Sequence, residues 1–298
     1  MANFAVKLAG LIWSALEIDF QDEMLTILDR GAAGSILRPV IVVVAIFSVL
    51  FGLAFGSFLN VCISRLPKHK SVVRPASFCP ACCEPILAGD NVPLLSWVIL
   101  RGRCRNCGWK IPSRYPLVEL GTALLFLLAY LTFGLTLEGA AVAILCFLLL
   151  GLAIMDAETL LLPDTFTLPG IVLGITYSAI RGGWRAGFLS VGYALAAAAI
   201  ILLIRGAYYL LRRQEGMGLG DAKLLAMIAT WLGPWLTLLV LVLGVSVAAI
   251  FGLIWLALKK QNRMRNLQLP FGSFLCAAAI YAIYCGQPIL RWYMQFFP

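Results

Sequence analysis

Apolar residues fill most of this chain in uninterrupted stretches, which short polar connections separate. A helix needs roughly 20 apolar residues to cross the hydrocarbon core of a bilayer, whereas a membrane β-strand shows about ten residues of alternating polarity. The pattern therefore predicts an all-α polytopic protein embedded in the lipid bilayer. We expect about eight transmembrane helices, at residues 39–63, 115–133, 139–155, 165–180, 188–210, 222–235, 236–258 and 270–284.

The composition supports a membrane location. Hydrophobic residues make up 62% of the 298 residues and charged residues only 12%, whereas soluble domains average roughly 45–50% and 25%. The segment before Arg30 holds five acidic residues and lacks the basic, apolar and small-residue regions of a cleavable leader. We therefore expect no signal peptide, so the spans themselves would direct insertion.

The basic residues are unevenly distributed, and their distribution predicts the topology. Seventeen of the 23 Lys and Arg residues lie in the connections 64–114, 205–223 and 259–265. By the positive-inside rule these connections are cytoplasmic, and the net charge of +9 reports orientation and not a nucleic-acid partner. Counting spans then places residues 156–164 on the cytoplasmic side too, with both chain termini outside.

Three kinds of segment follow from this topology. Residues 1–38 carry apolar side chains at helical spacing, which is typical of an amphipathic interfacial extension. Residues 64–114, between the first span at 39–63 and the next, form a proline-rich cytoplasmic loop that is too small for an ordinary hydrophobic core. Residues 115–298 would form the membrane-embedded core.

Two CxxC pairs in this loop predict the element that stabilises it. The sequences CPACC and CRNCGW supply Cys79, Cys82, Cys104 and Cys107, a pattern typical of a tetrahedral zinc site. Four protein ligands would close the site, so zinc would be structural. Cys83 also has a permitted spacing from Cys79, and this alternative stays open. A redox pair or disulfides fit less well, because the loop lacks a βαβ context and faces the reducing cytoplasm.

Two aspartates form the candidate catalytic pair. Asp221 follows two glycines in GLGDAKLL and opens an apolar run, while Asp156 closes the run LCFLLLGLAIM. The predicted topology places both at the same cytoplasmic depth, and charged groups at such positions are rare unless paired or functional. Two close carboxylates share a proton and activate water, which is aspartyl protease chemistry. The open alternatives are a first-turn acid for Asp221 and an interfacial acid for Asp156.

The remaining acidic and imidazole groups have other expected roles. Asp164 is expected to cap the fourth span, and Glu158 to be exposed. Because the loop 156–164 contains no basic residue, we hypothesise that it attracts a cationic segment of a substrate. His69 is the sole histidine, which argues against a Ser-His-Asp triad and against a catalytic zinc site built from histidines.

The chain resembles the type IV prepilin peptidases, polytopic aspartyl proteases of the bacterial inner membrane. Several stretches carry the resemblance, in the order of the family: GSFLNVCISRLP, the cysteine quartet, SRYPLVEL, MDAETLLLPD, EGMGLGDAKLL and LPFGSFL. The resemblance implies that Asp156 and Asp221 catalyse cleavage at the cytoplasmic face. The substrates implied are prepilins and pseudopilins, which lose a short basic leader after a glycine. The sequence does not separate pilus assembly from type II secretion.

The resemblance also implies a second activity. Many members methylate the new amino terminus with S-adenosylmethionine, and in the family this activity accompanies the large loop that bears the cysteine quartet. The residues themselves show no strand followed by a glycine-rich nucleotide loop, so the sequence locates no donor site.

Two other function classes remain as alternatives. A transporter or channel would also use intramembrane carboxylates, but Asp156 and Asp221 are predicted at one membrane face and the chain shows no repeated halves. A non-enzymatic assembly component would use the zinc loop to bind partners and would leave the aspartate pair unexplained.

Overall fold

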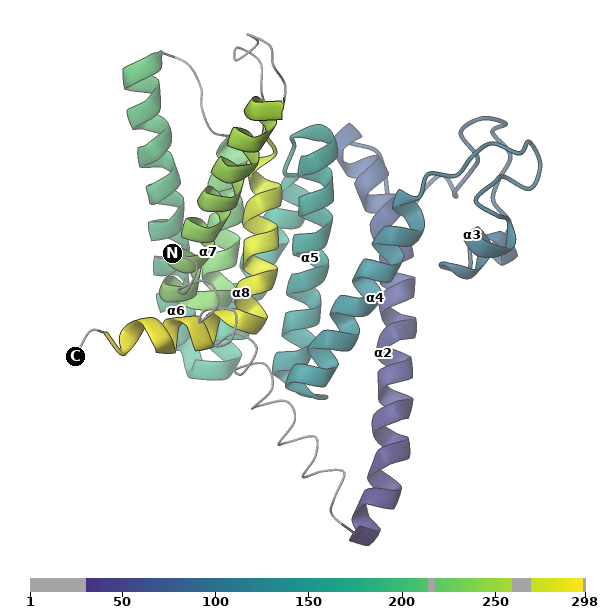
Figure 1. Cartoon of the computed structure of the whole chain (residues 1–298), viewed down its shortest axis with the longest axis horizontal. Helices are drawn as coiled ribbons and strands as arrows, with labels where there is room; N and C mark the ends of the chain where they lie inside the picture. The colour runs from purple at the N-terminus through teal and green to yellow at the C-terminus, as the bar shows by residue number, and fades with distance from the viewer. Residues whose placement is uncertain (1–30, 214–217, 259–268, 297–298) are drawn as a thin grey trace.

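The computed structural model describes residues 31–213, 218–258 and 269–296. Over these residues the chain is helical, with isolated β-bridges in the loop segment in place of strands. Figure 1 shows the helices side by side in one bundle, with a small loop domain protruding beside the end drawn uppermost. The predicted amphipathic extension at residues 1–38 lies outside the described residues, except for the backbone of its last eight.

Six helices in the described residues are long and apolar enough to cross a membrane. They confirm the predicted all-α membrane class, and their bounds are α2 Gly31–Arg65, α4 Arg114–Phe133, α5 Leu137–Thr159, α6 Asp164–Arg212, α7 Leu219–Leu258 and α8 Phe271–Met294.

The difference between six helices and the predicted eight arises from kinks in α6 and α7. Gly183 and Gly233 adopt φ near 73° and 74° with ψ of −179°, inside otherwise helical segments. Only glycine adopts this region readily, because a Cβ atom would clash with the backbone. Ile175 and Val191, on opposite sides of Gly183, line one cavity, so the two halves of α6 lie along each other. The kink at Gly183 falls between the predicted spans 165–180 and 188–210, whereas Gly233 lies inside the predicted span 222–235, two residues before its expected end. Eight distinct spans stay a prediction.

Small residues allow α2 to pack closely on α4. A Cβ atom at Gly52 would lie 2.5 Å from the Cα of Ala123, and one at Gly56 would lie 2.6 Å from the Cα of Glu119. The two glycines have the GxxxG spacing that favours close helix contacts in membranes. Beyond this pair, α4 contacts α5, α5 contacts α8, and α8 and α6 both contact α7.

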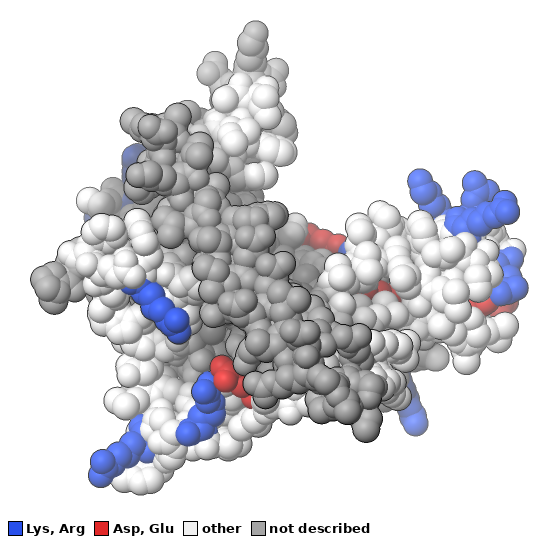
Figure 2. Space-filling view, turned by 60° about the horizontal axis from the view of Figure 1, so that its bottom comes forward, with Lys and Arg blue, Asp and Glu red and all other residues white. Residues whose placement is uncertain are grey.

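The buried core lies among these helices and leaves a wide apolar surface. Leu149, Leu152, Met227 and Leu275 are fully buried, whereas many large apolar side chains face outward along all six helices, as lipid contact requires. In Figure 2 the visible described residues of the bundle are largely white, and basic side chains gather on the protruding loop domain at the right.

Candidate active site

The fold brings the two predicted aspartates to the same end of the bundle. Asp156 lies in the last turn of α5 and Asp221 in the first turn of α7, although 65 residues separate them in the chain. Their residues are only 5% and 8% exposed. The two carboxylates are close enough for their charges to interact. Buried, neighbouring carboxylates are the arrangement that a shared proton requires.

Asp221 also acts as the first-turn acid that the alternative interpretation describes. Its Oδ2 accepts a hydrogen bond of 3.2 Å from the backbone N–H of Gly218, the residue before α7 begins. This is the carboxylate half of a capping box, and it satisfies a backbone donor that the helix leaves unpaired. The contact fixes one oxygen of Asp221 and thereby orients the carboxyl group.

Asp156 has a partner that the sequence analysis missed. The backbone N–H of Ser273 donates to Asp156 Oδ2 at 2.7 Å, and Ser273 Oγ lies 3.0 Å from the same oxygen. Ser273 is the third residue of α8, within the stretch LPFGSFL. The sequence placed Ser273 in a stretch that carried the resemblance and at the start of an apolar run, but neither position reveals a contact 117 residues away.

Two glycines permit the starts of α7 and α8 to approach Leu162 beside the pair. A Cβ atom at Gly272 would lie 3.1 Å from Asp156 Oδ2 and 2.9 Å from Leu162 Cδ1. A Cβ atom at Gly220 would lie 3.0 Å from Leu162 Cβ. The side chain of Leu162 therefore packs between the starts of the two helices, next to the carboxylates.

The other acidic residues at this end are paired with basic ones. Lys223 Nζ binds both oxygens of Asp164 at 2.6 and 2.8 Å, and Arg114 binds Glu158 at 2.5 Å. The side chain of Glu158 is 39% exposed, as expected. The prediction that Asp164 caps its helix is wrong: Pro163 occupies the cap position, and Asp164 is the first helical residue. These ion pairs offset the negative charge of Glu158 and Asp164, which the hypothesis needs to attract a cationic segment of a substrate.

Glu119 lies apart from the pair and contacts the loop domain. It is 8% exposed within α4, and its Oε2 accepts a hydrogen bond of 2.6 Å from the backbone N–H of Leu94. Leu94 has φ 59° and ψ −49°, an uncommon conformation for a residue with a side chain. This carboxylate thus connects the membrane bundle to the segment between the two cysteine pairs.

The four predicted cysteines meet in the loop domain. The sulfur atoms of Cys79, Cys82, Cys104 and Cys107 lie within 4.8 Å of one another, and Cys79 and Cys107 are 3.8 Å apart. Tetrahedral zinc with Zn–S bonds of about 2.3 Å separates its sulfurs by roughly 3.8 Å, so the cluster fits such an ion. Backbone N–H groups of Cys82 and Ala81 lower the pKa of Cys79 to about 7, whereas burial and neighbouring thiols raise the pKa values of Cys82 and Cys107.

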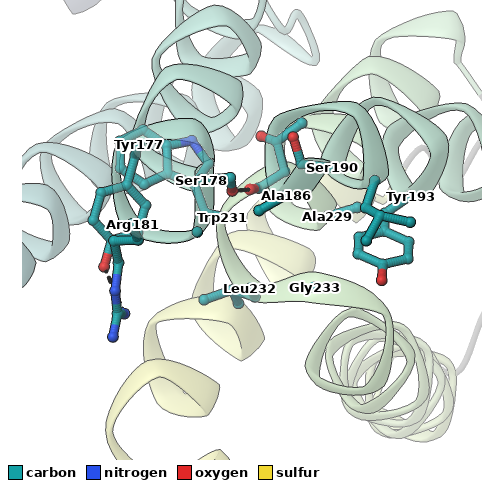
Figure 3. Close-up of a pocket in the computed structure, with 13 residues that line it drawn as sticks. Tyr177, Ser178, Arg181, Ala186, Ser190, Tyr193, Ala229, Trp231, Leu232 and Gly233 are labelled. Atoms are coloured by element: carbon teal, nitrogen blue, oxygen red, sulfur yellow. Dashed lines mark hydrogen bonds between the residues drawn. The ribbon is translucent and has the colours of Figure 1, made fainter. Parts of the chain in front are cut away.

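Two cavities lie elsewhere in the bundle. One of about 370 Å³ opens at the far end, around the glycine kinks, and Figure 3 shows Tyr177, Arg181, Tyr193 and Trp231 around it. The other, of about 390 Å³, lies between the halves of α6 and the start of α7 and is almost entirely apolar, with Lys223 as its only charged residue. Neither contains Asp156 or Asp221.

Comparison with known proteins matches two successive parts of the chain. Residues 50–133 match the bacterial peptidase A24 N-terminal domain, and residues 143–254 match the type IV leader peptidase family. The chain is 38% identical over 271 residues to a prepilin leader peptidase/N-methyltransferase of Aeromonas salmonicida, covering 83% of this chain and 92% of the relative. A protein with the same name from Pseudomonas aeruginosa is 37% identical over 276 residues, covering 84% and 93%. No solved structure matches the chain.

Proposed function

This chain belongs to the type IV leader peptidase family, and from that membership we propose that it is an aspartyl endopeptidase of prepilins and pseudopilins, with Asp156 and Asp221 as its catalytic pair. The enzyme removes the short basic leader after a glycine. The observation that carries the proposal is the meeting of these two buried carboxylates, from α5 and α7, at one end of the bundle.

The reaction requires one proton shared by the pair. One carboxylate, ionised, takes a proton from a water molecule as the water oxygen attacks the scissile carbonyl carbon. The other, protonated, gives its proton to the carbonyl oxygen. When the tetrahedral intermediate collapses, the carboxyl group that took the proton from water gives it to the amine nitrogen as the C–N bond breaks, and the other carboxylate regains its proton from the hydroxyl that reforms the carbonyl. Burial of both groups supports this chemistry, because electrostatic interactions strengthen where water is excluded.

The proposed location is the bacterial inner membrane, with the pair at the cytoplasmic face. Arg114, the first residue of α4, binds Glu158, two residues after Asp156, so the aspartates share their end of the bundle with the beginning of α4, which follows the basic loop domain. Since that loop holds nine Lys and Arg residues between residues 64 and 114, the positive-inside rule assigns this end to the cytoplasm. A cytoplasmic site would meet the leader before the substrate's apolar segment leaves that side.

The second proposed activity is methylation of the new amino terminus, with S-adenosylmethionine as donor. The names of the relatives support it. Neither cavity fits the donor, because one is almost wholly apolar and the other opens at the end remote from the aspartates. We therefore assign no residues to donor binding and derive no step of the transfer.

The cysteine cluster would hold a structural zinc ion. Cys79, Cys82, Cys104 and Cys107 would supply four thiolates, which closes the coordination shell and leaves no position for a catalytic water. The metal would fix the two CxxC turns relative to each other. Its role is to fold the loop domain, which otherwise has only short helical segments and isolated bridges.

The test is leader removal in cells that co-express a tagged prepilin with the wild type, Asp156→Asn or Asp221→Asn. Mass spectrometry of the substrate's amino terminus reports cleavage and methylation in one measurement. We expect the wild type to cleave after glycine and both variants to leave the leader in place. Asp164→Asn is the matched control, because it removes an acidic group at the same end of the bundle that is ion-paired to Lys223.

Three outcomes would reject parts of the proposal. Cleavage by either asparagine variant would remove that aspartate from the pair. Cleavage at a residue other than glycine would reject the specificity. A wild type that inserts and folds but leaves a panel of prepilins intact would instead favour the transporter alternative.

A further inference from the structure

Ser273 holds Asp156 through one oxygen only. Within the described residues, the hydrogen bonds from the backbone N–H and the hydroxyl of Ser273 both end at Oδ2, at 2.7 and 3.0 Å. Ser273 Oγ is also 2.7 Å from the carbonyl oxygen of Ala153, one turn back along α5. A hydroxyl carries a single hydrogen, so it donates to Ala153 or to Asp156 at any moment, but not to both.

The backbone N–H favours one form of Asp156. It points at Oδ2, so a neutral Asp156 would have to carry its proton on Oδ1, and both donors of Ser273 would then meet an uncharged oxygen. When Asp156 is ionised, the N–H and the hydroxyl both donate to a charged oxygen, which is the stronger kind of hydrogen bond. The first turn of α8 adds its unpaired N–H groups and the positive end of its dipole. Oδ1 then remains for a water molecule.

The carboxylates of Asp156 and Asp221 differ in the hydrogen bonds that they accept. Asp221 accepts one hydrogen bond, of 3.2 Å, from the adjacent Gly218 within its own helix start. Asp156 accepts one of 2.7 Å from the backbone N–H of Ser273 on a separate helix, and it can accept a second of 3.0 Å when the Ser273 hydroxyl turns from Ala153. Gly272 makes that contact possible, because a Cβ atom there would lie 3.1 Å from Oδ2. The surroundings thus favour the anion more at Asp156 than at Asp221.

We propose that Ser273 is a positioning residue that assigns the roles in the pair, keeping Asp156 ionised as the general base and leaving the shared proton on Asp221. This inference rests on the proposed peptidase function. Asp156 Oδ1 takes a proton from water while the water oxygen bonds to the scissile carbonyl carbon, and Asp221 protonates the carbonyl oxygen. On collapse, Asp156 returns its proton to the amine nitrogen as the C–N bond breaks. Asp221 regains its proton from the hydroxyl that reforms the carbonyl.

The test compares Ser273→Ala and Ser273→Thr with the wild type, using purified full-length protein and a tagged prepilin. Alanine removes the hydroxyl but keeps the backbone donor, and threonine keeps both. A hydrogen bond to a charged group predicts that alanine lowers kcat about 10- to 100-fold. KM should stay within about twofold of wild type, because the contact acts on the base and not on substrate binding. Threonine should restore most of the rate.

Ser246→Ala is the matched control, because Ser246 also donates its hydroxyl to a helix carbonyl, that of Val242, but lies exposed on α7. Thermal unfolding is measured for every variant. An unchanged or raised kcat in Ser273→Ala would overturn the inference. That result would fit the opposite assignment, in which Asp156 is the general acid and loss of the Ser273 hydroxyl does not slow the reaction. A rise in KM alone, or a loss of rate that follows lost stability and that threonine does not restore, would also overturn it. If Asp156→Asn is inactive while Ser273→Ala has the wild-type rate, only this inference fails and the proposed function stands.

Discussion

Cys83 occupies in the first cysteine turn the position that Gly108 occupies in the second. Each lies four residues after the first cysteine of its pair, and its backbone N–H donates to that cysteine's carbonyl, at 2.9 and 3.0 Å. Both have positive φ, 60° and 70°. The two turns are therefore equivalent, and Cys83 is a turn residue whose sulfur lies outside the cluster of four.

This equivalence predicts that Cys83→Gly stabilises the loop domain. A residue with a Cβ atom in the left-handed region costs roughly 1–2 kcal/mol, and glycine avoids most of that cost. We expect a gain of about 0.5–1 kcal/mol with zinc content unchanged, measured by hydrogen exchange of the loop and by metal analysis. The reciprocal change, Gly108→Ala, should destabilise the loop by a similar amount. Loss of zinc from Cys83→Gly would instead make Cys83 a ligand.

Metal removal should unfold the loop domain and leave the membrane bundle helical. The purified protein should contain one zinc ion per chain, and a chelator should expose residues 64–113 to trypsin, because so small a domain depends on its metal for stability. Circular dichroism should change little, since most helical residues belong to the bundle. Cys82→Ser should lose zinc and Cys83→Ser should keep it; equal loss from both would contradict the assignment.

Glu119→Ala should release the loop domain from the bundle. The change removes the acceptor for the Leu94 N–H, and a hydrogen bond to a charged group is worth about 1.5–3 kcal/mol. We expect faster hydrogen exchange at Leu94 and faster tryptic cleavage in the loop, with leader cleavage reporting whether the bundle itself is intact. Glu119→Gln, which keeps an oxygen acceptor, should have a smaller effect.

The control for that release is Glu138→Ala. Glu138 forms an exposed ion pair of 3.2 Å with Arg181 at the opposite end of the bundle, and such pairs contribute about 0–1 kcal/mol. Equal loop exchange in the two alanine variants would show that the Glu119 contact does not hold the loop.

Gly220→Ala should impair the site, whereas Gly218→Ala should be tolerated. The added methyl at residue 220 would lie 3.0 Å from Leu162 Cβ, an atom close to the backbone that cannot rotate away, while the methyl at residue 218 meets nothing closer than 3.5 Å. Overpacking of this kind costs about 1–3 kcal/mol. Thermal unfolding and prepilin cleavage should both decline in the first variant. Equal behaviour of the two would show that the start of α7 moves freely against Leu162.

Local patterns carried the predictions that the structure supports. The apolar run lengths specified an all-helical membrane bundle, because bilayer thickness sets helix length. The boundary predicted between residues 180 and 188 contains the kink at Gly183, but the kink at Gly233 lies two residues before the predicted boundary at 235, and the sequence could not show whether the chain continues as one kinked helix or as two separate ones. That difference depends on how the two halves of each helix pack against each other, and hydropathy along the chain carries no information about packing.

The sequence by itself determined the chemistry available to this protein: four thiolates in two CxxC pairs, and two carboxylates at the ends of apolar runs, because spacing and hydropathy depend only on local order along the chain. Only the tertiary structure decided how those groups are held. It paired Asp164 with Lys223, turned Glu119 toward Leu94, and set Ser273 against Asp156 across 117 residues. These contacts join segments that are far apart in the chain, and the contact of Ser273 with Asp156 depends on close packing at Gly272, which no local pattern encodes.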